Sequence, residues 1–102
     1  MPARARLSRL AQREFNEAAR WIASDSPSAA RALRDAVQRA AHLIPEHPLI
    51  GVSRPDLAPA PFRFLVVRGF PYLAIYDPTT RPPTIVRIVH GARDLPEVLR
   101  DL

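Results

Sequence analysis

The spacing of apolar residues changes once along this chain, and that change limits what it can fold into. From Leu10 to Ile44 apolar side chains recur every three or four residues, the period of an amphipathic helix. From Phe62 to His90 they alternate with their neighbours, the period of a β-strand. The stretch 45–61 holds five of the twelve prolines, has neither period and is expected to be a loop. The chain is therefore expected to be α+β.

Two helices are expected in the first half of the chain. The first follows Ser8, a residue type that often caps a helix N-terminus, and extends to about Ser24. The second follows Ser26 and has Pro27 at its first position, where the missing N–H costs nothing. Pro45 is expected to end it. Because the break between the helices is short, they are expected to form an antiparallel hairpin.

Four strands and a final helix complete the expected order. The segments expected to be strands are residues 3–7, 62–69, 70–77 and 84–91. Asp94 and Glu97 fit a capping box at the start of a C-terminal helix. The order is β-α-α-β-β-β-α within one domain, residues 1–102. We expect the N-terminal helical hairpin to cover one face of a small antiparallel sheet and to leave the other face partly open.

The composition excludes several kinds of site. There is no cysteine, so disulfides and thiolate metal sites are unavailable. All fifteen basic residues are arginine, which excludes a lysine catalyst, and the net charge is +5. That bias reflects either genome composition or a surface for phosphates, carboxylates or an acidic partner. His42 and His47 lack further ligands nearby, so neither a metal nor a cofactor is expected. With no long apolar run, a cytoplasmic location without membrane contact is expected.

Four arginines of the strand region are candidates for binding a partner. They are Arg63, Arg68, Arg87 and Arg93. On an open sheet face they could join Tyr72 and Tyr76 in a surface for RNA or an extended peptide. The alternative for Arg87 is an ion pair with Asp77 or Glu14. For the two tyrosines, and for Trp21 beside the first helix's apolar stripe, core packing is the expected role, and the binding surface is the alternative.

His90 lies at the end of the last expected strand, three residues before Arg93. An imidazole near neutrality could act as an acid or base, and Arg93 could hold a phosphate. No second base or nucleophile is evident nearby, so a hydrogen bond from His90 to a backbone carbonyl is the favoured interpretation.

Four stretches carry a more specific signal. They read "LSRLAQREFNEAARWIA", "AARALRDAVQRAAHLIPEHPLIG", "RFLVVRGFPYLAIYD" and "IVRIVHGARDLPEVL". Together they resemble the ParE branch of the RelE/ParE toxin superfamily over nearly the full length. The most specific pieces are the Tyr-x-x-x-Tyr of Tyr72 and Tyr76 and the strand end "VHGARD".

The resemblance implies a small toxin that an antitoxin neutralises by wrapping its C-terminal segment around it. RelE-like members cleave mRNA in the ribosome, whereas ParE-like members act on DNA gyrase. The cleaving members use lysines, and this chain has no lysine. They also use an arginine in the middle strand and a tyrosine in the C-terminal helix. At these positions this chain has Leu73 or a neighbour and Leu99. Only Arg93 is retained, with His90 a partial match. If the chain were a nuclease, these two residues would be catalytic.

The expected function is therefore that of a type II toxin that inhibits DNA gyrase and is neutralised by a ParD-like antitoxin. No catalytic residue and no direct sequence-specific binding of nucleic acid are expected. The alternatives are a ribosome-dependent mRNA endoribonuclease of the RelE type and a non-toxic relative that only binds antitoxin. The candidates for contact with antitoxin or target are Arg63, Arg68, Tyr72, Tyr76, Arg87, His90 and Arg93.

Overall fold

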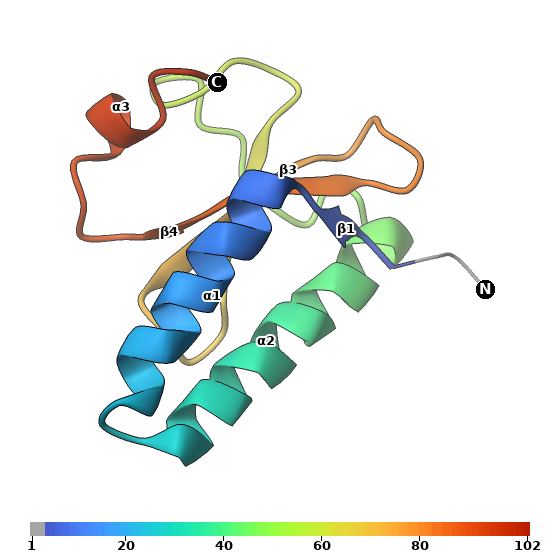
Figure 1. The fold of residues 1–102 in the computed structure, drawn as a ribbon. Coiled ribbons are helices and arrows are strands. Elements are labelled where there is room, and N and C mark those ends of the chain that lie inside the picture. Colours follow the sequence, from blue (N-terminus) through green and yellow to red (C-terminus); the bar gives the residue numbers. More distant parts are fainter. Residues whose placement is uncertain (1–3) are drawn as a thin grey trace.

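The structure, a computed structural model, describes residues 4–102. Its elements in chain order are β1 (Arg6–Leu7), α1 (Arg9–Ala23), α2 (Pro27–Glu46), β2 (Arg63–Val66), β3 (Tyr72–Asp77), β4 (Thr84–His90) and α3 (Leu95–Val98). This is the predicted order, and the α+β class is confirmed (Figure 1). Within the described residues, no helix is both long enough and apolar enough to cross a membrane.

Both long helices begin where the sequence predicts. The Ser8 hydroxyl accepts a hydrogen bond from the Ala11 N–H at 3.0 Å, and the Ser26 hydroxyl accepts one from the Ala29 N–H at 3.2 Å. These caps satisfy N–H groups that the first helical turn leaves without partners. At the short α3 the predicted capping box is absent, because the Asp94 side chain makes no capping hydrogen bond.

Pro45 does not end the second helix, contrary to the prediction, because α2 continues to Glu46. A proline inside a helix has no N–H to give the carbonyl four residues earlier, here that of Ala41. That carbonyl instead accepts a hydrogen bond from the Ala5 N–H at 2.7 Å. The proline is therefore tolerated near the helix end, and the carbonyl it releases attaches the N-terminal segment to α2.

The four strands form one sheet in the order β1-β4-β3-β2. Neighbouring strands among β2, β3 and β4 are antiparallel as predicted, whereas β1 pairs with β4 in parallel, so the sheet is mixed. The strand expected over residues 3–7 is found only at Arg6–Leu7, and residue 3 lies outside the described part. An irregularity between Ile75 and Tyr76 shifts the register against β4. Such bulges bend a strand and redirect its side chains.

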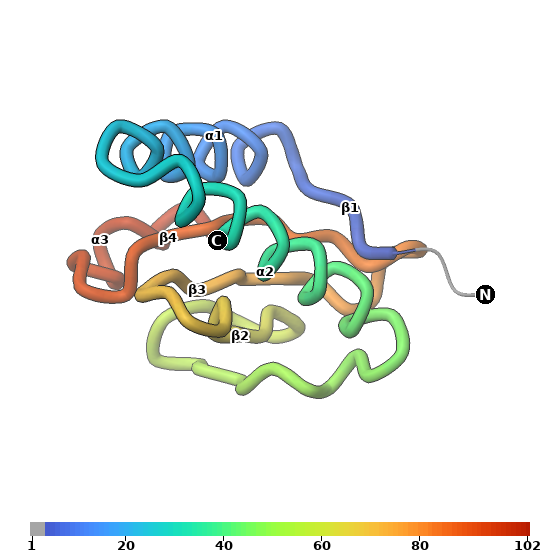
Figure 2. The backbone as a smooth tube through the Cα atoms, turned by 90° about the horizontal axis from the view of Figure 1, so that it is seen from below, coloured from blue at the N-terminus to red at the C-terminus, as the bar shows by residue number. Residues whose placement is uncertain are grey.

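The helical hairpin covers one face of the sheet and the outer edge of β4. Figure 2 shows α1 beside β4, with β3 and β2 following, and α2 crossing in front of the strands. Buried side chains of α2 such as Leu33 and Ile44 belong to the same apolar cluster as Ala74, Tyr76 and Ile85 of the sheet. This cluster is the main core.

The second face of the sheet is covered, so the predicted open face is wrong. Phe64, Ile75 and Val89 point to that face and form a separate buried cluster with Ala58 and Leu99. Other apolar side chains of the loop after α2 and of the C-terminal segment pack around it, namely Leu57, Phe62, Leu95, Val98 and Leu102. The proline-rich loop and the chain end thus act as a second layer, since both carry apolar residues that need burial.

Candidate functional site

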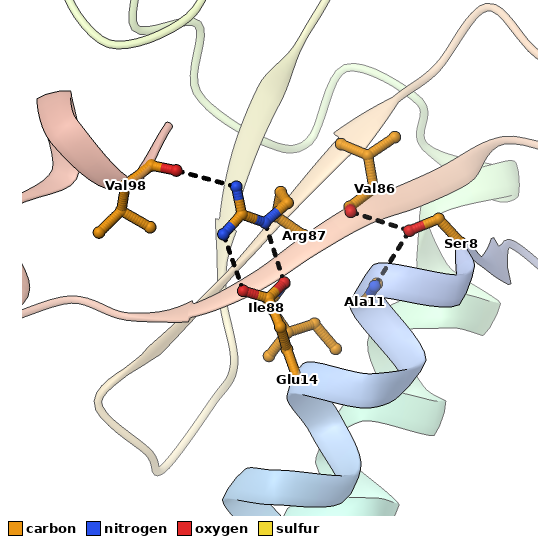
Figure 3. A network of polar contacts seen from close by, with 7 residues as sticks. All are labelled: Ser8, Ala11, Glu14, Val86, Arg87, Ile88 and Val98. Carbon is orange, nitrogen blue, oxygen red and sulfur yellow. Dashed lines mark hydrogen bonds and ion pairs between the residues drawn. The ribbon is translucent and has the colours of Figure 1, made fainter. Parts of the chain in front are cut away.

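Arg87 lies in the middle of β4 and is held by three internal contacts (Figure 3). Its Nε and Nη2 donate to the two carboxylate oxygens of Glu14 at 3.0 and 2.9 Å, and its Nη1 donates to the Val98 carbonyl at 2.9 Å. Both charged side chains are only 12% exposed. The hydrogen bonds with Glu14 raise the pKa of Arg87 above its ordinary value, so it stays charged. The ion pair predicted with Asp77 or Glu14 is therefore confirmed for Glu14.

The outer edge of β4 pairs with β1 only at Thr84 and Ile85. Further along this edge, the side chains of Ser8 and Glu14 bond the backbone of β4. The Ser8 hydroxyl donates to the Val86 carbonyl at 2.9 Å, and a Glu14 oxygen accepts the Ile88 N–H at 3.0 Å. Unpaired strand edges invite association with other chains. Here side chains of the N-terminal segment and α1 take the place of a neighbouring strand.

The four strand-region arginines do not form the common surface that the sequence suggested. The guanidinium of Arg87 is already bonded to the Glu14 carboxylate and the Val98 carbonyl. Arg63 donates from Nε to the Gly51 carbonyl at 2.8 Å and so attaches the loop after α2 to β2. Arg68, in the turn after β2, and Arg93, after β4, are exposed. Two of the four candidates are thus structural, and two remain accessible.

The two tyrosines of β3 have different environments. Tyr76 is fully buried, and its hydroxyl donates to the Pro48 carbonyl at 2.7 Å and accepts the Gly51 N–H at 2.9 Å. Its predicted core role is confirmed. Tyr72 is half-buried and meets the His90 ring edge-on, with ring centres 5.2 Å apart. Only Tyr72 can therefore contact a partner.

Trp21 is 78% exposed, so its predicted core packing is wrong. It lies at helical intervals from Glu14 and Glu17, whose carboxylates mark that side of α1 as polar. This spacing could have indicated that Trp21 is exposed. The neighbouring Ile22 belongs to the apolar stripe and led to the prediction that Trp21 is buried as well.

Trp21 borders a pocket between α1 and the end of β4, which we call the edge pocket. Its volume is about 230 Å³. Its lining comprises Glu14, Glu17, Ala18, Trp21, Tyr72, Ile88, His90 and Arg93. Three of the predicted binding candidates, Tyr72, His90 and Arg93, therefore lie together, and α1 adds residues that the sequence interpretation missed.

The ionisable groups of the edge pocket are not arranged as phosphodiester cleavage needs them. His90 Nδ1 accepts the Ala92 N–H at 3.1 Å, rather than bonding a backbone carbonyl as predicted. That contact leaves the Nε2 atom of His90 open to a partner, and Arg93 is an exposed cation. Glu14 is occupied by Arg87. In-line attack by a hydroxyl requires a base, an acid and charge stabilisation aligned together. Glu17 and Arg93 are exposed, and the side chain of His90 bonds the Ala92 N–H and neither of them, so this set suits binding better than cleavage.

A larger hollow of about 470 Å³ lies between β1, α1 and α2, and we call it the basic groove. Its apolar floor consists of Ala5, Leu7, Phe15, Val37 and Ala41. Its polar rim consists of Arg4, Arg6, Gln12, Arg34 and Gln38. The sequence interpretation missed this groove, because its residues come from three segments whose proximity depends on the fold. It shares no lining residue with the edge pocket.

Among residues 4–102, no three His, Asp or Glu side chains gather closely enough to hold a metal ion. His42 and His47 are both exposed at the C-terminal end of α2.

Comparison with solved structures gives a fold match at low sequence identity. The structure titled "Chromosomal ParDE TA system from P. aeruginosa" contains a chain that superposes with a TM-score of 0.69 at 17% identity. The match covers 85% of this chain and 94% of that one. At this identity it establishes the fold. A search of curated proteins gave no match.

Comparison with protein-family models gives the assignment. Residues 5–95 match the model described as the ParE toxin of the type II toxin-antitoxin system parDE. The matched range includes β1, both long helices, the remaining strands, the edge pocket and every lining residue of the basic groove except Arg4. The chain therefore belongs to the ParE toxin family of type II toxin-antitoxin systems.

Proposed function

We propose that this toxin inhibits DNA gyrase and that a ParD-like antitoxin neutralises it. Membership of the ParE family supports the gyrase target. The observation that carries the proposal is the limited chemistry of the edge pocket, where Arg93 is the single arginine of the lining and one of the two carboxylates, Glu14, is already paired with Arg87. The resemblance places the arginine of cleaving relatives at Leu73 or a neighbour and their tyrosine at Leu99, and both leucines pack in the second apolar cluster. A binding mode of inhibition needs no such groups.

The basic groove is the proposed binding site of the antitoxin. An apolar floor beneath arginines suits an amphipathic segment that buries aliphatic side chains and presents carboxylates to the rim. Apolar anchors in such a site supply most of the affinity, while rim charges chiefly affect the association rate. The proposal thus assigns antitoxin contact to Arg4, Arg6 and Arg34 instead of Arg63 and Arg87.

Two assays with the purified toxin test its target. We expect inhibition of gyrase supercoiling and no cleavage of mRNA on translating ribosomes. Cleavage without gyrase inhibition would instead establish the endoribonuclease alternative. Absence of any growth defect when the chain is expressed alone would point to a non-toxic relative.

The antitoxin binding site is tested with a charge reversal on α2. A short acidic reading frame beside the toxin gene is the expected antitoxin, and its purified product is titrated calorimetrically. Arg34→Glu should weaken binding and reduce its dependence on salt, because Arg34 lines the basic groove. Arg39→Glu is the matched control, since Arg39 is also exposed on α2 but lines neither pocket. Equal affinities of the two variants would place the antitoxin elsewhere.

A further inference from the structure

Trp21 borders the edge pocket without packing into the core. The indole is 78% exposed on α1 and stands at the rim of a hollow of about 230 Å³. Water occupies about 30 Å³ per molecule in the liquid, so a hollow of this size has room for several water molecules or for one apolar side chain of a partner. Exposed tryptophans beside a desolvating pocket are typical of binding hot spots.

The walls of the edge pocket are held rigidly. Ile88 is fixed through its N–H by Glu14, and the same carboxylate holds Arg87 on the neighbouring position of β4. Tyr72 and His90 pack edge to face with ring centres 5.2 Å apart. A preformed pocket loses little conformational entropy on binding. The rigid walls therefore favour docking of a partner side chain between Trp21 and Tyr72.

The accessible charges at the rim restrict the kind of partner. Glu17 and Arg93 are both exposed, one negative and one positive, whereas Glu14 is committed to Arg87. A nucleic-acid backbone is uniformly negative and would meet the Glu17 carboxylate. A protein surface can instead present a carboxylate to Arg93, a cation to Glu17 and an apolar side chain between them.

The edge pocket and the basic groove lie on different sides of α1. Gln12 and Phe15 face the groove, whereas Glu17, Ala18 and Trp21 face the pocket. With 3.6 residues per turn, these two sets project from separate sides of the helix. One partner segment in the groove therefore leaves the pocket available to a second partner.

From this arrangement we infer that the edge pocket is the surface that docks the toxin's target protein, with Trp21 as its anchor. The inference rests on the proposed function, which names DNA gyrase as that target. It extends the earlier candidates Tyr72, His90 and Arg93 by adding Trp21 as the apolar contact and Glu17 as the second rim charge. It also separates target contact from antitoxin contact.

The first experiment measures binding of the purified toxin to immobilised gyrase, together with supercoiling inhibition. Trp21→Ala should raise the dissociation constant at least about 30-fold, the loss expected for a hot-spot side chain. Leu49→Ala is the matched control, because Leu49 is an apolar side chain that is 69% exposed and lies outside the pocket. Thermal unfolding of both variants should match the wild type, since each side chain is largely exposed.

A charge variant separates a protein target from a nucleic acid. Glu17→Arg should weaken gyrase binding if the partner presents a cation there, and Arg93→Glu should weaken it as well. If Glu17→Arg instead strengthens binding, and a labelled single-stranded oligonucleotide binds in a Trp21-dependent way, the partner is a nucleic acid and the inference is wrong.

Footprinting with hydroxyl radicals locates the contact directly. Trp21 is the single tryptophan of the chain, so its oxidation is readily followed by mass spectrometry. Gyrase should reduce oxidation of Trp21 several-fold and leave that of Leu49 unchanged. If the wild type inhibits gyrase but Trp21→Ala inhibits equally well, the inference fails and the proposed function stands. If the wild type neither binds nor inhibits gyrase, the proposed function fails first and the inference with it.

Discussion

The Glu14 carboxylate and the Arg87 guanidinium, 73 residues apart in the chain, meet in a two-point ion pair at the outer edge of β4 (Figure 3). The same carboxylate accepts the Ile88 N–H, and the same guanidinium donates to the Val98 carbonyl. One pair of side chains thus joins α1, β4 and the C-terminal segment. The first long helix and the last strand are thus fixed to each other by charge as well as by apolar packing.

Removing one partner of this ion pair should lower the free energy of unfolding by more than the intact pair contributes to it. Glu14→Gln or Arg87→Met leaves a mostly buried partner without its counter-charge, which costs about 3 kcal/mol, the lower part of the range for buried pairs. The double variant should lose less than the sum of the two, because it removes both charges. Urea unfolding of the four proteins measures the coupling. Glu97→Gln, which breaks an exposed ion pair with Arg100, is the control and should change stability by less than about 1 kcal/mol. Strict additivity would contradict the pair's role.

The Tyr76 hydroxyl should be a structural group and contribute nothing to partner binding. Tyr76→Phe removes the acceptor for the Gly51 N–H and the donor for the Pro48 carbonyl, so the free energy of unfolding should fall by about 1–3 kcal/mol. Exchange of the Gly51 amide should accelerate. Tyr72→Phe is the matched control on the same strand, because the ring contact of Tyr72 with His90 survives. If both variants are equally stable, the buried hydroxyl does not hold the loop.

Gly51 should tolerate no side chain. A Cβ at this position would lie 2.6 Å from Tyr76 Cε1 and 2.9 Å from its hydroxyl, and both atoms are fixed in the core. Gly51→Ala should therefore cost about 1–3 kcal/mol, as overpacking does. Gly91→Ala is the control, because its nearest neighbour, the Pro71 carbonyl oxygen, would be 3.6 Å away. Thermal unfolding should show little change or a small gain for the control. Equal losses in the two variants would show that the clash at Gly51 is relieved by movement.

The sequence predicts most of the fold because its signals are local. Ser8 and Ser26 cap their helices through contacts only three residues away, and the change of apolar period marks the boundary between helices and strands. The parallel pairing of β1 with β4 joins segments nearly eighty positions apart and has no local signal. The covered second face was missed for a similar reason, because proline-rich composition obscured the apolar side chains of the loop.

The candidate site was only partly predictable. Strand spacing identified Tyr72, His90 and Arg93, which do line one pocket. It also offered the internal ion pair of Arg87 with Glu14. It could not show that Arg63 is held internally, because the partners of Arg63 are backbone carbonyls that no sequence pattern reveals. The basic groove combines residues near positions 5, 13 and 37 and exists only once the chain has folded.

Pro45 should help to hold the N-terminal wall of the basic groove against α2. Lacking an N–H, Pro45 leaves the Ala41 carbonyl to the Ala5 N–H, which lies between the rim residues Arg4 and Arg6. Pro45→Ala would supply a competing donor from within α2. The Ala5 amide should then exchange faster with solvent, as measured by NMR, and antitoxin binding should weaken because the groove wall is less firmly attached. Pro27→Ala, at the first position of the same helix, releases no interior carbonyl and is the control. Unchanged exchange at Ala5 in the Pro45 variant would show that apolar packing alone holds the N-terminal segment against α2.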